Sequence, residues 1–338
     1  MARILHIAAH KANPRAWTRP FVKGLREFGE LHIITGGDDL SDEEAAAHIR
    51  GHDVLITSWG ARATPATLAV DPGRLRYICH LTGAMGAYIP VELIESAIPV
   101  TYWGDAQSRP VAEGAVLLLL ASLKGLRERI DNVEAGHWNP PEQGFRSAML
   151  WGLALGVYGF GFIGRTFVDM VRPFGPRIRI FDPFAADIPG DCERVESLET
   201  LFDGSHAVAI HAGWTAKTAG SVTARLLALL PDGGVLINTA RGAIVDQQAL
   251  FAELESGRLR AGLDVLLPPE QLPAEHPARR WPNLVLTTHS LSQPFPKDYV
   301  SDDAFEPMHH ICLDNVRRHL AGETLKFPMD RARYELST

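Results

Sequence analysis

Short apolar runs alternate with helical patterns along nearly the whole chain, and this alternation constrains the fold more than any other feature. A strand, a crossover helix and then another strand is the order that builds a parallel α/β sheet. In the first part of the chain, the expected strands are Ile4–Ala8, Leu31–Ile34, Val54–Thr57, Tyr77–Leu81 and Val100–Trp103. The expected helices between them are Arg19–Phe28, Asp42–Arg50, Thr64–Val70 and Val91–Ser96. These elements predict a first α/β unit with five strands.

A second α/β unit is expected after a long helical segment at about residues 110–134. Within this segment, Leu117–Leu120 is apolar on every side of the helix, which predicts that it is buried. The expected strands of the second unit are Ala154–Tyr158, Ile178–Phe181, Ala207–His211, Val235–Asn238, Gly262–Val265 and Val285–Thr288. Six strands with intervening helices match a doubly wound, nucleotide-binding sheet. Residues 302–320 then return to a helical pattern.

Composition and charge argue against several classes of function. The 338 residues are enough for two domains, and the net charge of -7, without long runs of one sign, gives no footprint for nucleic acid. Residues 1–7 lack a signal-peptide pattern, and no apolar run is long enough to span a bilayer. The cysteines, Cys79, Cys192 and Cys312, show neither a pairable nor a metal-ligand spacing. We therefore expect a cytoplasmic protein with reduced thiols, no metal site, and no membrane or nucleic-acid partner.

A glycine-rich loop, Gly159-Phe160-Gly161-Phe162-Ile163-Gly164, follows the first strand of the second unit and precedes a helical pattern. Gly159 allows the tight turn, Gly161 lets a pyrophosphate approach the backbone, and Gly164 lets the helix pack on the strand. The amides and the dipole at the helix start favour the same anion. The loop therefore predicts dinucleotide binding, with Phe162 and Ile163 at the start of the helix.

An acid stands where a dinucleotide-binding sheet needs one. Asp182 ends the strand Ile178–Phe181, eighteen residues after the glycine loop. Its carboxylate can accept hydrogen bonds from the adenosine ribose and would repel a 2′-phosphate, which favours NAD over NADP. The nearby cations Arg177 and Arg179 keep NADP as the alternative cofactor. The alternative role for Asp182 is to cap the turn at Pro183.

Three side chains with complementary chemistry, Arg241, Glu270 and His289, follow the carboxyl ends of expected strands. Ligands of open α/β sheets bind at this edge, so one crevice can gather all three. An arginine there can hold a carboxylate through two parallel hydrogen bonds and can stabilise charge on a carbonyl oxygen. A carboxylate beside an imidazole stabilises its charged form, which can donate a proton. Each residue also has an ordinary alternative role. Arg241 would form a surface ion pair, Glu270 would be an ordinary loop acid, and His289 would be a structural histidine.

Together these motifs resemble the D-isomer-specific 2-hydroxyacid dehydrogenase family, most closely from residue 152 to residue 289. The most specific match is Asn238-Thr239-Ala240-Arg241-Gly242, followed by Val245-Asp246 and Ala249-Leu250. The resemblance includes the phosphoglycerate dehydrogenase-like and glyoxylate/hydroxypyruvate reductase-like members. It implies that Arg241 binds the substrate carboxylate, that Glu270 supports the histidine, and that His289 exchanges the proton.

The resemblance implies further ligand-binding residues. Beyond the glycine loop and the acid after it, the positions assigned to the cofactor are His211, Ala212, Thr239, Ala240 and Asp264, the last at the nicotinamide carboxamide. In the first unit, the segment Thr82–Gly86 is similar to a loop whose backbone amides hold the substrate. The positions assigned to the substrate there are Gly83, Ala84 and Gly86.

The implied fold is α/β, with two doubly wound parallel-sheet domains. A Rossmann NAD-binding domain, residues 106–299, is inserted into a flavodoxin-like substrate domain made of residues 1–105 and 300–338. The family arrangement implies an active site in the cleft and a homodimer formed through the cofactor domain.

Several positions depart from the family pattern. The glutamate usually follows the aspartate by five residues, whereas Glu270 follows Asp264 by six, which indicates one inserted residue. His289 stands between Thr288 and Ser290, where a proline and an apolar residue are usual. The substrate loop continues as Gly86-Ala87-Tyr88, where a glycine and an aspartate are common. These departures are compatible with the reaction, and they do not identify which 2-keto acid is the substrate.

The expected function is hydride transfer between NAD(H) and a small 2-keto or D-2-hydroxy acid. The alternatives are a non-catalytic NAD(H)-sensing binding protein on the same fold, and a formate- or phosphite-type dehydrogenase. Trp59 and Tyr88 follow strand ends and are either packing residues or part of the substrate pocket.

Overall fold

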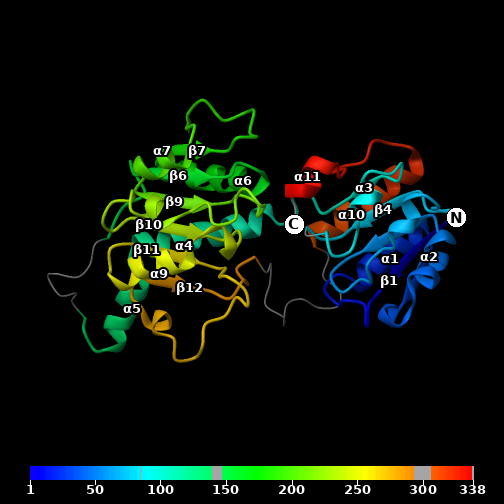
Figure 1. The fold of residues 1–338 in the computed structure, drawn as a ribbon, viewed down its shortest axis with the longest axis horizontal. Coiled ribbons are helices and arrows are strands. Elements are labelled where there is room, and N and C mark those ends of the chain that lie inside the picture. Colours follow the sequence, from blue (N-terminus) through cyan, green and yellow to red (C-terminus); the bar gives the residue numbers. More distant parts are fainter. Residues whose placement is uncertain (84, 139–146, 293–305, 337–338) are drawn as a thin grey trace. The chain divides into compact units, whose positions relative to one another are not determined.

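The computed structural model describes residues 1–83, 85–138, 147–292 and 306–336. The chain divides into two compact units, Met1–Gln107 with Phe295–Thr338, called unit 1, and Ser108–Pro294, called unit 2. Figure 1 shows a sheet with helices in each unit.

Unit 1 is a parallel sheet with strand order β2-β1-β3-β4-β5, so the winding reverses between β1 and β3. Its strands are β1 (Ala2–Ile7), β2 (Gly29–Ile34), β3 (Val54–Thr57), β4 (Tyr77–His80) and β5 (Val100–Thr101). Its helices are α1 (Arg19–Phe28), α2 (Asp42–Arg50), α3 (Val91–Ile94), α10 (Pro307–Ala321) and α11 (Arg331–Leu336), with short 3-10 turns η1 (Gly37–Asp39) and η2 (Ala66–Ala69).

The core of unit 1 has two halves because successive strand residues point to opposite faces. Leu5 belongs to the half that also contains residues of α2 and α3. Ile4 belongs to the half that contains residues of α1 and α10. The helix α10, from the C-terminal part of the chain, therefore completes the core of unit 1.

Unit 2 is a parallel sheet with strand order β12-β11-β10-β9-β6-β7-β8. Its strands are β6 (Ala154–Tyr158), β7 (Arg177–Phe181), β8 (Glu193–Arg194), β9 (Ala207–Ile210), β10 (Val235–Asn238), β11 (Arg260–Leu263) and β12 (Leu284–Leu286). Its helices are α4 (Ser108–Leu123), α5 (Leu126–Glu134), α6 (Phe162–Val171), α7 (Leu198–Asp203), α8 (Ala224–Leu227) and α9 (Gln247–Glu255), with the 3-10 turns η3 (Arg172–Phe174), η4 (Gly242–Ile244) and η5 (Pro277–Arg280). Residues of α4 and α6 share one half of the core, and residues of α7, α8 and α9 share the other. The two doubly wound parallel sheets confirm the expected fold class.

Three expectations about elements were wrong, and one strand was missed. The long helical segment is two helices, because Gly125, at φ 57°, interrupts it between α4 and α5. The side chain of Leu117 is not buried, since the residue is 54% exposed. Residues 64–70 hold only the 3-10 turn η2, and the strand β8, whose two residues are both exposed, was not expected.

The cysteines are closer in space than in sequence. The Cys79 thiol on β4 is in hydrogen-bond contact with the Cys312 thiol on α10, and both residues are buried. All three cysteines are free thiols. Among the helices of the described residues, none has the length and apolarity that crossing a membrane requires.

Candidate active site

The glycine loop between β6 and α6 leaves room for a ligand at one position and none at the others. Gly159 has φ 95°, and a Cβ there would lie 2.5 Å from the amide nitrogen of Ala212. A Cβ on Gly164 would clash with the carbonyl oxygen of Gly159, so the helix packs against the turn. A Cβ on Gly161, the N-cap of α6, would meet no heavy atom of the described residues within 4 Å. The loop is thus a cradle whose open position faces the amides of α6.

Asp182, directly after β7, ties the glycine loop to the next turn. Its Oδ2 accepts a hydrogen bond from the Phe160 amide at 2.6 Å. Its Oδ1 accepts hydrogen bonds from the amides of Phe184 at 2.7 Å and Ala185 at 3.1 Å. The structure therefore shows the turn-capping role of Asp182, and ribose binding by the same carboxylate remains a prediction.

Arg177 and Arg179, which made NADP the alternative cofactor, both bind other groups of the protein. Arg179 makes an ion pair with Glu193 of β8 at 3.0 Å, and Arg177 donates to the carbonyl oxygen of Gly152 at 3.2 Å. A different cation, Arg194 of β8, donates to the carbonyl oxygens of Asp182 and Ala185. Arg194 could not be found from the sequence, because the strand that carries it has no apolar residue.

Two buried side chains of unit 2, one of them beside the glycine loop, lack hydrogen-bond partners among the described residues. Both ring nitrogens of His211, the residue after β9, are without a hydrogen bond among the described residues, as is the Thr239 hydroxyl after β10. Burial lowers the pKa of His211 to about 3, so the ring is neutral, and it packs against Phe167 at a centroid distance of 4.6 Å. Unpaired buried polar atoms are costly unless a ligand or water satisfies them. Together with the open cradle, they fit the expected dinucleotide, which would run past both side chains.

Arg241 stands on a rigid turn after β10. The Asn238 side chain holds this turn, because its Nδ2 donates to the Arg241 carbonyl at 2.9 Å and its Oδ1 accepts from the Ala240 amide at 3.0 Å. Gly242 packs so closely on the backbone of Leu266 that a Cβ would clash. Arg241 is exposed, and its Nη1 donates to the Ala240 carbonyl at 2.8 Å. No ion pair of Arg241 with an acid is found among the described residues, which leaves its charge for a ligand.

Glu270 and His289 lie together. The Nδ1 atom of His289 and the Oε2 atom of Glu270 are 2.7 Å apart, and the two side chains are 45% and 33% exposed. Both residues have left-handed backbone, with φ 54° at His289 and φ 53° at Glu270. A glutamate on Nδ1 leaves Nε2 as the ring nitrogen that can meet a substrate. The shifted glutamate therefore reaches the histidine despite its extra residue.

Asp264 fixes the backbone on both sides of the histidine. Its Oδ1 accepts hydrogen bonds from the Thr287 hydroxyl at 2.6 Å and from the Ser290 amide at 3.2 Å. Its carbonyl oxygen accepts the His289 amide at 2.8 Å. Sequence reasoning missed Thr287 and Ser290, although their place beside the histidine was the available signal.

The elements of unit 2 bring these residues to one edge. The strands β10, β11 and β12 are neighbours, with Asn238 paired to Leu263 and Leu263 paired to Leu286. Arg241, Asp264 and His289 each follow one of these three strands. This is the edge at which open α/β sheets bind ligands.

The expected substrate loop belongs to unit 1 and follows β4. Ala84 lies outside the described residues. Gly83 packs against the Trp103 indole, Met85 is buried in the core, and Gly86 is exposed. The loop ends near Tyr88, whose hydroxyl accepts a long hydrogen bond of 3.4 Å from the Gly60 amide.

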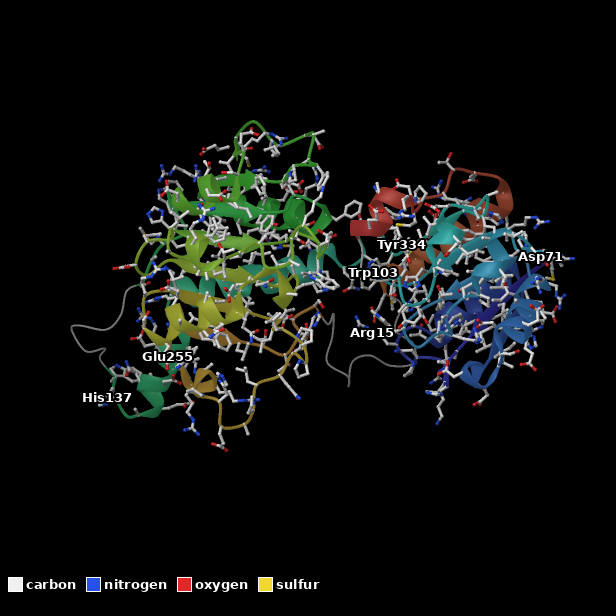
Figure 2. The ribbon with its side chains drawn as sticks, in the orientation of Figure 1. Arg15, Asp71, Trp103, His137, Glu255 and Tyr334 are labelled. Carbon is white, nitrogen blue, oxygen red and sulfur yellow. The ribbon has the colours of Figure 1, made fainter. Side chains whose placement is uncertain are left out.

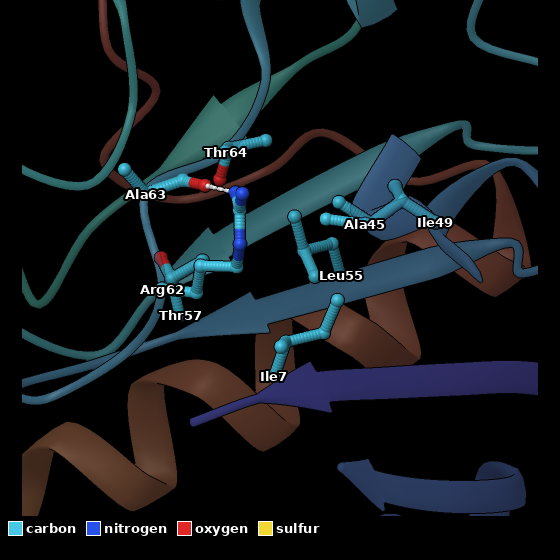
Figure 3. Close-up of a pocket in the computed structure, with 8 residues that line it drawn as sticks. All are labelled: Ile7, Ala45, Ile49, Leu55, Thr57, Arg62, Ala63 and Thr64. Carbon is cyan, nitrogen blue, oxygen red and sulfur yellow. Dashed lines mark hydrogen bonds between the residues drawn. The ribbon is translucent and has the colours of Figure 1, made fainter. Parts of the chain in front are cut away.

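A small pocket in unit 1 lies near the carboxyl ends of β1 and β3, between α2 and the residues after β3 (Figure 3). It is lined by Ile7, Ala45, Ile49, Leu55, Thr57, Arg62, Ala63 and Thr64. It contains none of the residues predicted to bind substrate or cofactor. Within the described ranges, no group of three or more histidine, cysteine or acidic side chains could hold a metal ion.

Known proteins are similar to this chain in sequence and in fold. Residues 116–290 match the model of the family described as "D-isomer specific 2-hydroxyacid dehydrogenase, NAD binding domain". The chain is similar to a D-3-phosphoglycerate dehydrogenase of Methanocaldococcus jannaschii, with 28% identity over 89% of this chain and 56% of that enzyme. A hydroxypyruvate reductase of Thermotoga maritima is 32% identical over 70% of this chain and 76% of its own length. The fold resembles Rhodotorula graminis D-mandelate dehydrogenase, with a TM-score of 0.78, 21% identity and 98% coverage of both chains.

Proposed function

Since the chain belongs to the D-isomer specific 2-hydroxyacid dehydrogenase family, we propose that it reversibly reduces a 2-keto acid to a D-2-hydroxy acid with NAD(H). The observation that carries the proposal is the 2.7 Å hydrogen bond between Glu270 and His289, at the sheet edge that also holds Arg241. The match spans only 56% of the Methanocaldococcus jannaschii enzyme, so neither its substrate nor its assembly is carried over. Unit 2 is the proposed cofactor domain and unit 1 the proposed substrate domain.

A bound nicotinamide would supply the hydride in reduction and take it up in oxidation. The open position at Gly161 and the amides of α6 would hold the pyrophosphate, and Asp182 the adenosine ribose. The Thr239 hydroxyl and the His211 ring, both unpartnered in the described residues, would line the remaining path. The Asp182 carboxylate supports NAD over NADP, because it would repel a 2′-phosphate, and Arg179 is already paired with Glu193.

The proposed proton donor is Nε2 of His289, since Nδ1 is held by Glu270. The carboxylate stabilises the charged imidazole and fixes the direction of the ring. Arg241 would hold the substrate carboxylate and stabilise the charge that develops on the keto oxygen. Gly83 and Gly86 are proposed to add backbone contacts to the substrate, as the family resemblance implies.

The experiment is a pair of steady-state assays, one that follows NADH oxidation with a panel of 2-keto acids and one that follows NAD+ reduction with formate or phosphite. Arg241→Ala and His289→Ala should each lower kcat/KM by at least about 100-fold, while NADH binding, followed by fluorescence, survives. The controls are Arg225→Ala and His137→Ala, which alter exposed side chains elsewhere in unit 2. NADH binding without turnover of any keto acid would indicate the non-catalytic alternative, and turnover of formate alone would indicate the formate-type alternative. Oxidation of formate releases hydride without a hydroxyl proton, which would leave the Glu270–His289 pair no proton to accept.

We further propose a cytoplasmic homodimer formed through unit 2. The helix α5 has no buried residue, and it presents an apolar stripe of Leu126, Ile130 and Val133, which are 44%, 46% and 57% exposed. The spacing of these residues places them on one face of the helix, and a second copy would cover that face. Ile130→Asp should therefore convert a dimer to a monomer in light scattering, whereas Glu128→Ala, on the opposite face of the helix, should not. A wild-type monomer would contradict the proposal.

A further inference from the structure

We propose that the substrate carries a bulky apolar or aromatic side chain, recognised by Trp59 and Trp103, and that the site disfavours a second anionic group. The inference rests on the proposed 2-keto acid chemistry and names the substrate class within it. It is carried by residues of unit 1 alone.

The two tryptophans stand at the carboxyl edge of the unit 1 sheet. Trp59 follows β3 and Trp103 follows β5, on either side of the strand β4 that leads into Gly83. Their rings meet edge to face, with centroids 5.7 Å apart and planes at 82°. In Figure 2, Trp103 and Arg15 lie on the side of unit 1 opposite Asp71, which precedes β4.

The tryptophan pair touches the predicted substrate loop. A Cβ on Gly83 would lie 2.5 Å from Nε1 of Trp103, so the indole covers the backbone of this glycine. At the other end of the loop, the Tyr88 hydroxyl meets the amide of Gly60, which directly follows Trp59. Both indoles remain partly exposed. A substrate held by the backbone at Gly83 would therefore extend beside aromatic surface.

Aromatic surface at this position selects for size and apolarity. Each methylene that a pocket buries is worth roughly 10- to 200-fold in kcat/KM. An aromatic side chain would also gain edge-to-face or stacked contacts with the indoles. Short keto acids such as pyruvate would leave these rings unused.

Arg15, which packs on this surface, and Arg62, which follows Trp59 by three residues, are already engaged. Arg15 packs over the Trp59 ring at 5.3 Å and donates to both carboxylate oxygens of Glu306, at 3.0 and 3.3 Å. Glu306 is only 6% exposed and caps the start of α10. Arg62, in the pocket of Figure 3, donates to the carbonyl oxygens of Gly37 and Ala63 and to Asp42. A phosphate or second carboxylate on the substrate would have to displace these partners.

The test compares kcat/KM for phenylpyruvate, pyruvate and oxaloacetate at saturating NADH. We expect phenylpyruvate to exceed pyruvate by at least about tenfold and oxaloacetate to fall below pyruvate. Pyruvate at or above phenylpyruvate, or oxaloacetate above both, would overturn the inference and leave the proposed function standing. No turnover of any keto acid would overturn both.

Variants separate recognition from folding. Trp59→Ala and Trp103→Ala should each lower the phenylpyruvate-to-pyruvate ratio of kcat/KM by about tenfold, and Trp59→Phe should keep most of it. The control is Trp151→Ala, an exposed tryptophan of unit 2. Equal losses for both substrates would mean that the tryptophans only support the fold, which contradicts the inference.

The paired arginine has its own test. Glu306→Gln keeps the shape of the helix cap and removes the negative charge that pairs with Arg15. The Arg15 guanidinium can then meet a second carboxylate, so the ratio of kcat/KM for oxaloacetate to that for pyruvate should rise severalfold. The control is Glu323→Gln, which breaks an exposed ion pair with Arg317. An unchanged ratio in Glu306→Gln would contradict the discrimination against anions.

Discussion

The Glu270–His289 pair depends on backbone that ordinary residues avoid. Both residues have positive φ, a conformation that costs free energy unless the surroundings enforce it. At His289 the enforcement comes from Asp264, which binds the Thr287 hydroxyl, the Ser290 amide and the His289 amide. The family resemblance assigns Asp264 to the cofactor, whereas the structure adds a role in positioning the histidine.

The two adjacent threonines test this role. Thr287→Val removes a hydroxyl donor from the buried Asp264 carboxylate and should lower kcat/KM by about tenfold, since a hydrogen bond to a charged group contributes roughly 1.5–3 kcal/mol. Thr288→Val is the matched control, because the Thr288 hydroxyl contacts only that of Ser290 among the described residues. Equal kcat/KM losses in the two variants would contradict the positioning role. Circular dichroism would check that both variants fold.

At the scale of elements, strands and the strand-to-helix turn were the most predictable parts. Parallel strands are covered on both faces, so they appear as short apolar runs, and β6 and β10 have the residues expected. The strand β8 could not be found in this way, because Glu193 and Arg194 are both exposed at the edge of the sheet. The division of the long helix was also hidden, since a single glycine in a helical pattern predicts either a weak point or an end.

The glycine loop permits a prediction that separates binding from folding. Gly161→Ala should raise the Kd for NADH at least about tenfold with little change in Tm, because its Cβ enters space that the described residues leave open. Gly164→Ala should instead lower Tm, since its Cβ would clash with the Gly159 carbonyl. Fluorescence titration with NADH and thermal unfolding measure the two effects. Wild-type affinity in Gly161→Ala would argue against pyrophosphate binding at this turn.

At the scale of the whole molecule, sequence motifs are more informative about candidate site residues than about contacts between distant segments. Arg241 could be proposed because its neighbours form a specific signature, and Glu270 and His289 because each follows a predicted strand end; the roles of all three stay predictions. The contact between Cys79 and Cys312 could not, because it joins a strand near the start of the chain to the C-terminal helix. The aromatic pair of Trp59 and Trp103 was hidden for the same reason, since no local pattern records which strand ends are neighbours.

Each unit buries a neutral histidine, which makes stability depend on pH. Burial lowers the pKa of His6 to about 4 and that of His211 to about 3. Between about pH 6.5 and these values, the two histidines are protonated in the unfolded chain but stay neutral in the folded chain. The free energy of unfolding therefore falls as the pH falls. Below the folded-state pKa of His6, this residue alone would lower the free energy of unfolding by about 3 kcal/mol, at 1.36 kcal/mol per pKa unit.

Urea unfolding at pH 7 and pH 5 measures this dependence. In His6→Gln, the side-chain amide can still donate to the Ile56 carbonyl, and the loss of unfolding free energy between the two pH values should be smaller than in the wild type. The control is His137→Gln, at an exposed position. The same pH dependence in wild type and His6→Gln would show that another group dominates it.

The most direct test of the central claim follows the hydride itself. NADH carrying deuterium at the transferable position of C4 is incubated with phenylpyruvate or pyruvate, and the product is examined by NMR and chiral chromatography. We predict a D-2-hydroxy acid with deuterium at C2 from the wild-type protein, and almost none from His289→Ala. A wild-type product without deuterium at C2, or equal labelling by His289→Ala, would contradict the claim.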